Sequence, residues 1–224
     1  MNSASKKAIL VVSFGTSYEN TRKLTIEAIE HDIADAFPAC PTYRAWTSKM
    51  IIAKLKKRDG LTIHTVKEAL EQMLLDGITD VIVQPTHVIN GIENDQMKAD
   101  ALSFRDRFSS IVFGNPLLTT EEDNQAIVRV VADEFRDMDP DTALVLMGHG
   151  TEHYANTVYA ALDYRFKDTG HKNIFLGKIE ITERESFWIS GNFYPNPEAS
   201  EFKSFFDALV CEDGFDESQF DEDL

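Results

Sequence analysis

Ala8-Ile-Leu-Val-Val-Ser13, followed by Phe-Gly-Thr16, is the stretch that decides the fold. An unbroken apolar run that ends at a glycine is typical of a parallel strand buried on both faces. The pattern starts again at Ala143-Leu-Val-Leu-Met147, which leads into Gly148-His-Gly-Thr151 with the Gly-Thr pair in the same register. We interpret the two segments as equivalent strands of an internal duplication.

Strand-like and helix-like segments alternate around these two runs. In the first half the patterns predict strands over residues 42–47, 80–84 and 111–114 and helices over 21–37, 65–75 and 94–108; in the second half they predict a helix over 154–167 and a strand over 173–179. This alternation indicates an α/β fold of two similar domains, residues 1–119 and 120–224, each a parallel sheet flanked by helices. Ligands in such sheets bind beyond the carboxyl ends of the strands.

The second repeat differs from the first after about residue 181. The first half continues through its third strand to Thr86-His-Val-Ile-Asn-Gly91, whereas the second half has no evident counterpart and offers only one amphipathic helix over residues 199–209. We therefore expect the second domain to be incomplete. Apolar surface of its sheet would be left over, and the remaining aromatic side chains would cover it either by folding back or by pairing with another subunit, which makes a homo-oligomer one expectation.

The composition excludes several classes of partner. A formal charge of −16 argues against nucleic acid and against anionic membrane surfaces. No run approaches the roughly 18 apolar residues of a membrane helix. The start of the sequence lacks a secretory pattern, so we expect a cytoplasmic protein. Cys40 and Cys211 lie far apart without a CxxC motif, so neither a disulfide framework nor a thiolate metal site is indicated. The sequence has no GxxxxGK[ST] loop, so direct use of ATP is not supported.

His149 is the strongest candidate for chemistry. It follows a predicted strand and stands between Gly148 and Gly150, which allow a ligand to approach closely. An imidazole can accept a proton or bind a borderline metal near neutral pH. The alternative is a loop histidine that is hydrogen-bonded to the backbone.

Two carboxylates and a second histidine join it as candidates. Glu180 ends the neighbouring predicted strand, so it either approaches His149 on the same rim as a metal ligand or faces solvent. Glu93 and His87 follow the third strand of the first half and would face the cleft from the other side. Glu93 would take or relay protons, and His87 would either orient a ligand or, as we prefer, pack. His153 is expected to begin a helix and meet water.

The other histidines are not expected to act. His31 and His64 are predicted to lie on the surface, and His171 is predicted to lie in a loop.

Three segments closely resemble the anaerobic sirohydrochlorin cobalt chelatases of cobalamin biosynthesis. They are Ala8-Ile-Leu-Val-Val-Ser-Phe-Gly-Thr-Ser17, Gln84-Pro-Thr-His-Val-Ile-Asn-Gly-Ile-Glu93 and Leu146-Met-Gly-His-Gly-Thr-Glu-His153, and the similarity runs from about residue 7 to 180. The resemblance implies a class II lyase that inserts Co²⁺ without ATP. Its substrate would be sirohydrochlorin, or the oxidised form factor II, held between two similar α/β domains.

The resemblance also implies roles for individual residues. His149 would take a pyrrole proton and bind cobalt, Glu180 would bind the metal, and Glu93 would be the cleft glutamate linked to catalysis. The family has another metal-binding histidine, on a loop that reads roughly Gly-Asp-His-Ala, whereas this sequence has no histidine after His171. We therefore expect impaired metal capture. The alternative is a non-catalytic tetrapyrrole- or metal-binding remnant of a chelatase.

The charge of the substrate adds one more expectation. Sirohydrochlorin is a polycarboxylate, which a chain of charge −16 repels overall. Local cations would therefore have to line the cleft, and the candidates are Arg22, Arg44, Lys49 and Arg165.

Overall fold

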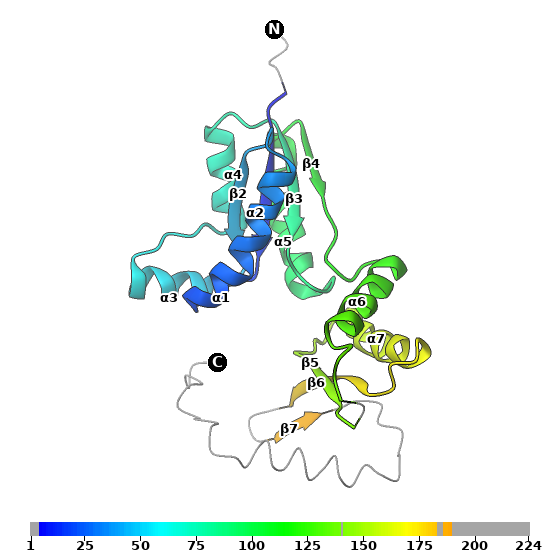
Figure 1. The fold of residues 1–224 in the computed structure, drawn as a ribbon. Coiled ribbons are helices and arrows are strands. Elements are labelled where there is room, and N and C mark those ends of the chain that lie inside the picture. The colour runs from blue at the N-terminus through cyan, green and yellow to red at the C-terminus, as the bar shows by residue number, and fades with distance from the viewer. Residues whose placement is uncertain (1–4, 140, 183–185, 190–224) are drawn as a thin grey trace.

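The computed structural model describes residues 5–139, 141–182 and 186–189, and it confirms the α/β class (Figure 1). The first half contains β1 (Lys7–Ser13), α1 (Glu19–Leu24), α2 (Ile26–Ala36), β2 (Thr42–Trp46), α3 (Lys49–Asp59), α4 (Val66–Leu75), β3 (Asp80–Pro85), α5 (Ile92–Leu102), η1 (Arg105–Arg107) and β4 (Ser110–Phe113). The second contains α6 (Glu121–Glu134), β5 (Leu144–Gly148), η2 (Tyr154–Asn156), α7 (Thr157–Asp168), β6 (Ile174–Thr182) and β7 (Ser186–Ile189).

The first sheet is parallel throughout, in the order β2-β1-β3-β4. β1, which contains the apolar run, is one of the two inner strands of this sheet. Its Leu10 is paired with Tyr43 of β2 and Val83 of β3. Every residue of β1 from Ala8 to Ser13 is buried. A continuous apolar strand is therefore placed where both of its faces are covered.

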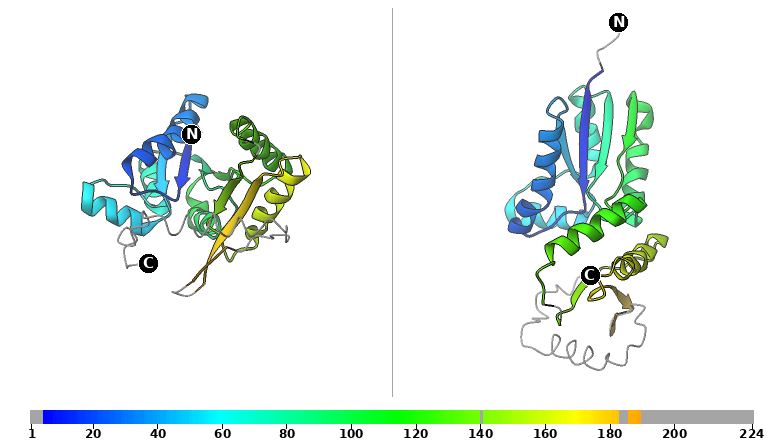
Figure 2. Two further views of the ribbon diagram at one scale, coloured as in Figure 1. Left: turned by 60° about the horizontal axis from the view of Figure 1, so that its bottom comes forward. Right: turned by 45° about the vertical axis from the view of Figure 1, so that its right-hand side comes forward.

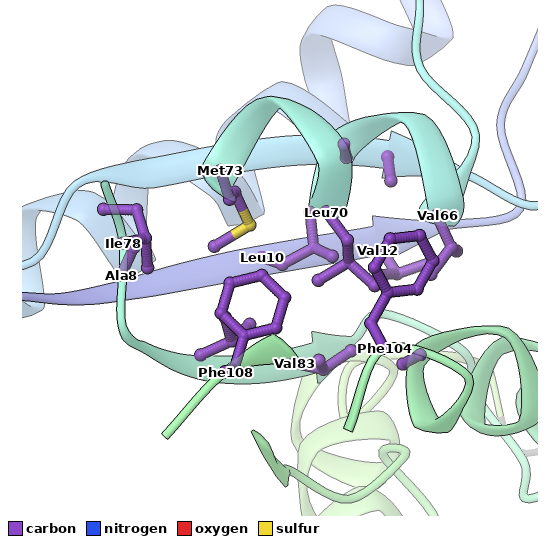
Figure 3. Close-up of a cluster of buried hydrophobic side chains, with 14 of the residues drawn as sticks. Ala8, Leu10, Val12, Val66, Leu70, Met73, Ile78, Val83, Phe104 and Phe108 are labelled. Carbon is purple, nitrogen blue, oxygen red and sulfur yellow. The ribbon is translucent and has the colours of Figure 1, made fainter. Parts of the chain in front are cut away.

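The main core lies between this sheet and helices α4 and α5. Figure 3 shows Leu10 and Val12 of β1 packed against Leu70 and Met73 of α4. Phe104, which follows α5 in the chain, belongs to the same cluster. Each such buried side chain contributes about 1.5–3 kcal/mol. On the opposite face, Arg44 of β2 reaches carboxylates of α2.

In the described residues the second sheet has three strands, in the order β5-β6-β7. The predicted parallel pair of β5 and β6 is present, with Leu144 opposite Ile174 and Gly148 opposite Lys178. β7, which the sequence patterns did not predict, runs antiparallel to β6. Figure 2 shows α6 and α7 side by side, and their apolar residues form a second core with β5 and β6.

The loop after β3 contacts the core of the second half. Ile89 packs into the second core, and it forms a parallel bridge with Leu118 at the entrance to α6. The N–H groups of Leu117 and Leu118 donate to the carbonyls of His87 (3.0 Å) and Val88 (2.8 Å). Of these contacts, only the packing of Ile89 runs across residue 119, and the division there stays a prediction.

Several predicted boundaries were wrong. The helix predicted over 21–37 is divided at Thr25, whose hydroxyl donates to the Thr21 carbonyl (2.7 Å) while its backbone leaves the helical region (φ −121°, ψ −75°). The helix predicted over 94–108 ends at Leu102, where the Ser103 hydroxyl donates to the carbonyl of Asp100. The helix predicted over 199–209 lies outside the described residues.

No helix in the described part of the chain has the length and apolar character needed to cross a bilayer.

Candidate active site

His149 lies directly after the last residue of β5, at the carboxyl end of the strand, and its side chain is exposed. Its Nδ1 lies 3.2 Å from the carbonyl oxygen of Gly150. A carbonyl oxygen only accepts, so this contact assigns the hydrogen of the neutral ring to Nδ1. The lone pair of Nε2 then remains available for a proton or a metal ion.

Both glycines beside His149 are required by the geometry. A Cβ on Gly148 would lie 2.1 Å from Cε1 of Tyr159 in α7, far inside van der Waals contact. Gly150 has φ +77°, in the left-handed region that side chains other than glycine rarely adopt. The Gly-His-Gly sequence thus brings α7 close to the end of β5 and turns the chain immediately after the imidazole.

The turn after His149 is held by side-chain hydrogen bonds. The N–H of Thr151 donates to Oδ1 of Asn156, and the N–H of His153 donates to Oγ1 of Thr151. Both donor–acceptor distances are 3.2 Å. His153 is the N-cap residue of η2, in agreement with the prediction that it starts a helix, and its Nδ1 accepts from the N–H of Ala155 (3.2 Å). The prediction that His153 meets water was wrong: its side chain is 15% exposed, and Nε2 lies 3.2 Å from Oδ2 of Asp95.

Glu93 is exposed in the first turn of α5, which begins after Gly91. A carboxylate at this position is stabilised by the positive end of the helix dipole. Asp95 lies in the same turn and makes the contact with His153. The structure therefore brings the start of α5, which carries Glu93, against the segment that follows His149.

His87 is a half-buried residue of the loop after β3. Neither of its ring nitrogens is exposed, and neither has a hydrogen-bond partner among the described residues. Burial lowers the pKa of His87, and the nearby charge of Glu93 opposes that shift only in part. An imidazole in these surroundings is neutral, which agrees with the packing role preferred from the sequence.

Glu180 lies within β6, two residues before the strand ends, and not at its end as predicted. The difference arises because β6 continues past β5 and pairs with β7, where Glu180 is in register with Trp188. Gly148 of β5 is paired with Lys178, so the backbone of Glu180 lies beyond the end of β5, on the rim where His149 is found. The side chain of Glu180 lies outside the described part of the structure.

The remaining histidines belong to other elements: His31 to α2, and His64 to the loop before α4. His31 pairs with Asp35 on the exposed side of α2 (3.0 Å), and the backbone carbonyl of His64 accepts from the N–H of Trp46. His171 lies in the turn between α7 and β6, as predicted. Among the side chains that the structure describes, no three of His, Cys, Asp or Glu converge as a metal site.

Most of the cations proposed for the cleft are already ion-paired. Arg44 is held by Glu30 and Glu27, Arg22 by Glu27, and Arg165 by Glu121. Lys49 is exposed at the first residue of α3. The three arginines are therefore engaged with carboxylates, and the expectation that cations such as these line the cleft stays a prediction.

The chain matches a protein-family model and is similar to curated proteins of known activity. Residues 7–184 match the family model described as cobalt chelatase (CbiK). The chain is 39% identical over 159 residues to a sirohydrochlorin cobaltochelatase of Salmonella typhimurium, covering 71% of this chain and 60% of that protein. It is 33% identical over 164 residues to sirohydrochlorin cobaltochelatase CbiKC of Nitratidesulfovibrio vulgaris, covering 70% and 56%. The chain therefore spans less than two thirds of the length of these curated relatives.

Proposed function

Because the chain belongs to the cobalt chelatase (CbiK) family, we propose that it inserts Co²⁺ into sirohydrochlorin, or into factor II, without ATP. The reaction would serve anaerobic cobalamin biosynthesis. The observation that carries this proposal is the exposed imidazole of His149 at the end of β5, whose Nε2 has no partner among the residues that the structure describes. The substrate would bind between the proposed halves, residues 1–119 and 120–224, and a homo-oligomer stays a prediction.

The chemistry requires a base and a weak metal site in one place. Two pyrrole N–H protons must leave the ring while Co²⁺ enters it. A metal ion that is held too tightly would not transfer to the ring. One imidazole and one carboxylate give an incomplete ligand set, which leaves coordination positions open to the nitrogens of the macrocycle.

His149 is proposed to perform both parts of this chemistry. Its Nε2 would first contact the incoming Co²⁺ and, after the metal has passed to the ring, would use the same lone pair to accept a pyrrole proton. The contact of Nδ1 with the Gly150 carbonyl orients the ring and leaves the lone pair of Nε2 for a proton or a metal ion. The exposure of the side chain is consistent with direct contact to a large, flat substrate.

The two glutamates are proposed to act separately. Glu180 shares the rim of the second sheet with His149 and would be the second protein ligand of cobalt. Glu93, at the start of α5, would receive or relay pyrrole protons from the other side of the cleft. Metal capture would therefore belong to the second half of the chain, and part of the proton transfer to the first half.

An insertion assay on the purified chain tests the proposal. Sirohydrochlorin and Co²⁺ are mixed with the protein under anaerobic conditions, and formation of the metallated ring is followed by visible absorbance. A control without protein measures spontaneous insertion. We expect a rate that is proportional to protein concentration, exceeds the control and does not change when ATP is added.

A second candidate function is favoured by one observation in the sequence. Residues 172–224 contain no histidine, although the family resemblance implies a second metal-binding histidine. A protein that binds a tetrapyrrole or a metal without inserting it would fit that composition. It would shift the absorbance of sirohydrochlorin stoichiometrically while insertion proceeded at the rate of the control, and this outcome would contradict the chelatase proposal.

A further inference from the structure

One polar contact joins the two halves of the chain beside the proposed catalytic residues. Nε2 of His153 lies 3.2 Å from Oδ2 of Asp95, and the two side chains are 15% and 59% exposed. His153 precedes η2 in the second half, and Asp95 belongs to the first turn of α5 in the first half.

The ring of His153 is fixed in orientation and in tautomer. Its Nδ1 accepts the N–H of Ala155, so in the neutral ring the hydrogen must reside on Nε2. That hydrogen is then directed to the carboxylate of Asp95. The ring of Tyr154 packs against the imidazole, with the centroids 4.1 Å apart. The imidazole is thus oriented to donate to Asp95 without the help of a substrate.

The two partners are close in sequence to the residues proposed to act. Asp95 lies two residues after Glu93 in the same helical turn. His153 lies four residues after His149, and its N–H is anchored to Oγ1 of Thr151 within the turn that follows His149. A shift of α5 against that turn would therefore change the separation of Glu93 and His149.

We infer that His153 and Asp95 are positioning residues that set the distance between Glu93 and His149 across the proposed cleft. The inference rests on the proposed function, and neither side chain is required to touch the substrate. A misplacement of reacting groups by about 1 Å can slow an enzyme roughly 100-fold. The ion pair of His31 and Asp35 has the same chemistry but lies within one helix, with side chains 73% and 72% exposed. It provides a matched control.

The kinetic test compares Asp95→Ala and His153→Ala with His31→Ala. We expect either of the first two variants to lower the maximal insertion rate about 10- to 100-fold, whereas His31→Ala leaves it unchanged. The cobalt concentration for half-maximal rate should stay constant, because both proposed metal ligands belong to the second half. Asp95→Asn retains an acceptor oxygen for Nε2–H and should restore most of the rate. A changed cobalt dependence with a constant maximal rate would overturn the inference.

A second measurement does not depend on activity. Spin labels are attached to Lys57→Cys and Asp168→Cys, two exposed positions, in chains whose native Cys40 and Cys211 are replaced by serine. The two labels report the distance between the halves. The distance distribution should broaden or shift in Asp95→Ala and His153→Ala and remain unchanged in His31→Ala. If the wild-type chain inserts no cobalt while the distributions still change, the proposed function fails and the positioning contact stands. Unchanged distributions in both Asp95→Ala and His153→Ala would overturn the contact itself.

Discussion

Replacing Gly148 by alanine tests how closely α7 approaches the end of β5. The added Cβ would lie 2.1 Å from Cε1 of Tyr159 and 2.7 Å from both Cδ1 and Cζ. Carbon atoms in good contact are about 3.5–4.0 Å apart, so the ring or the strand must move by about 1.5 Å. Overpacking of this kind costs about 1–3 kcal/mol, and we expect the free energy of unfolding to fall by that amount.

A double-mutant cycle assigns the loss to its cause. The free energy of unfolding is measured by denaturant titration for the wild type, Gly148→Ala, Tyr159→Ala and the double variant. With the ring removed, Gly148→Ala should be neutral, or should stabilise the fold by up to about 1 kcal/mol by restricting the unfolded chain. An equal loss in both backgrounds, or none in either, would refute the close packing of Tyr159 on the residue before His149.

Further predictions concern charge and kinetics. Burial lowers the pKa of His87, so the folded chain binds fewer protons than the unfolded chain, and stability should fall as pH falls below about 6.5. His87→Leu should flatten that decline in melting temperature between pH 7 and 5, and an unchanged slope would contradict it. Glu180→Ala should raise the cobalt concentration for half-maximal rate, whereas Glu93→Ala should mainly lower the maximal rate; identical cobalt dependence in the Glu180 variant and the wild type would contradict the assignment.

β1 and β5 were predictable because each contains an uninterrupted apolar run. Two helices, α3 and α6, were not predicted; each has a single buried residue, Leu55 and Val128 respectively, and carries many charged side chains. A local pattern for α6 was nevertheless present. Thr120 and Asp123 form a capping box, and the Thr-x-x-Asp spacing that produces it is visible in the amino-acid sequence alone.

The candidate site was predictable only where one local pattern defines it. His149 follows an apolar strand and stands between two glycines, so its place at a strand end could be predicted from neighbouring residues. The contact between His153 and Asp95 joins residues far apart in the sequence, and no local pattern reports it. The extension of β6 past Glu180 depends on pairing with β7, which is equally a matter of tertiary structure.

Removing the imidazole of His149 separates its chemistry from its contribution to folding. The side chain is exposed, so His149→Ala should leave the circular dichroism spectrum and the melting temperature unchanged. The rate of cobalt insertion into sirohydrochlorin, measured in single turnover with protein in excess, should fall at least about 100-fold, which is the lower range for the loss of a general base. A folded His149→Ala variant that inserts cobalt at the wild-type rate would contradict the assignment of this residue and the mechanism proposed around it.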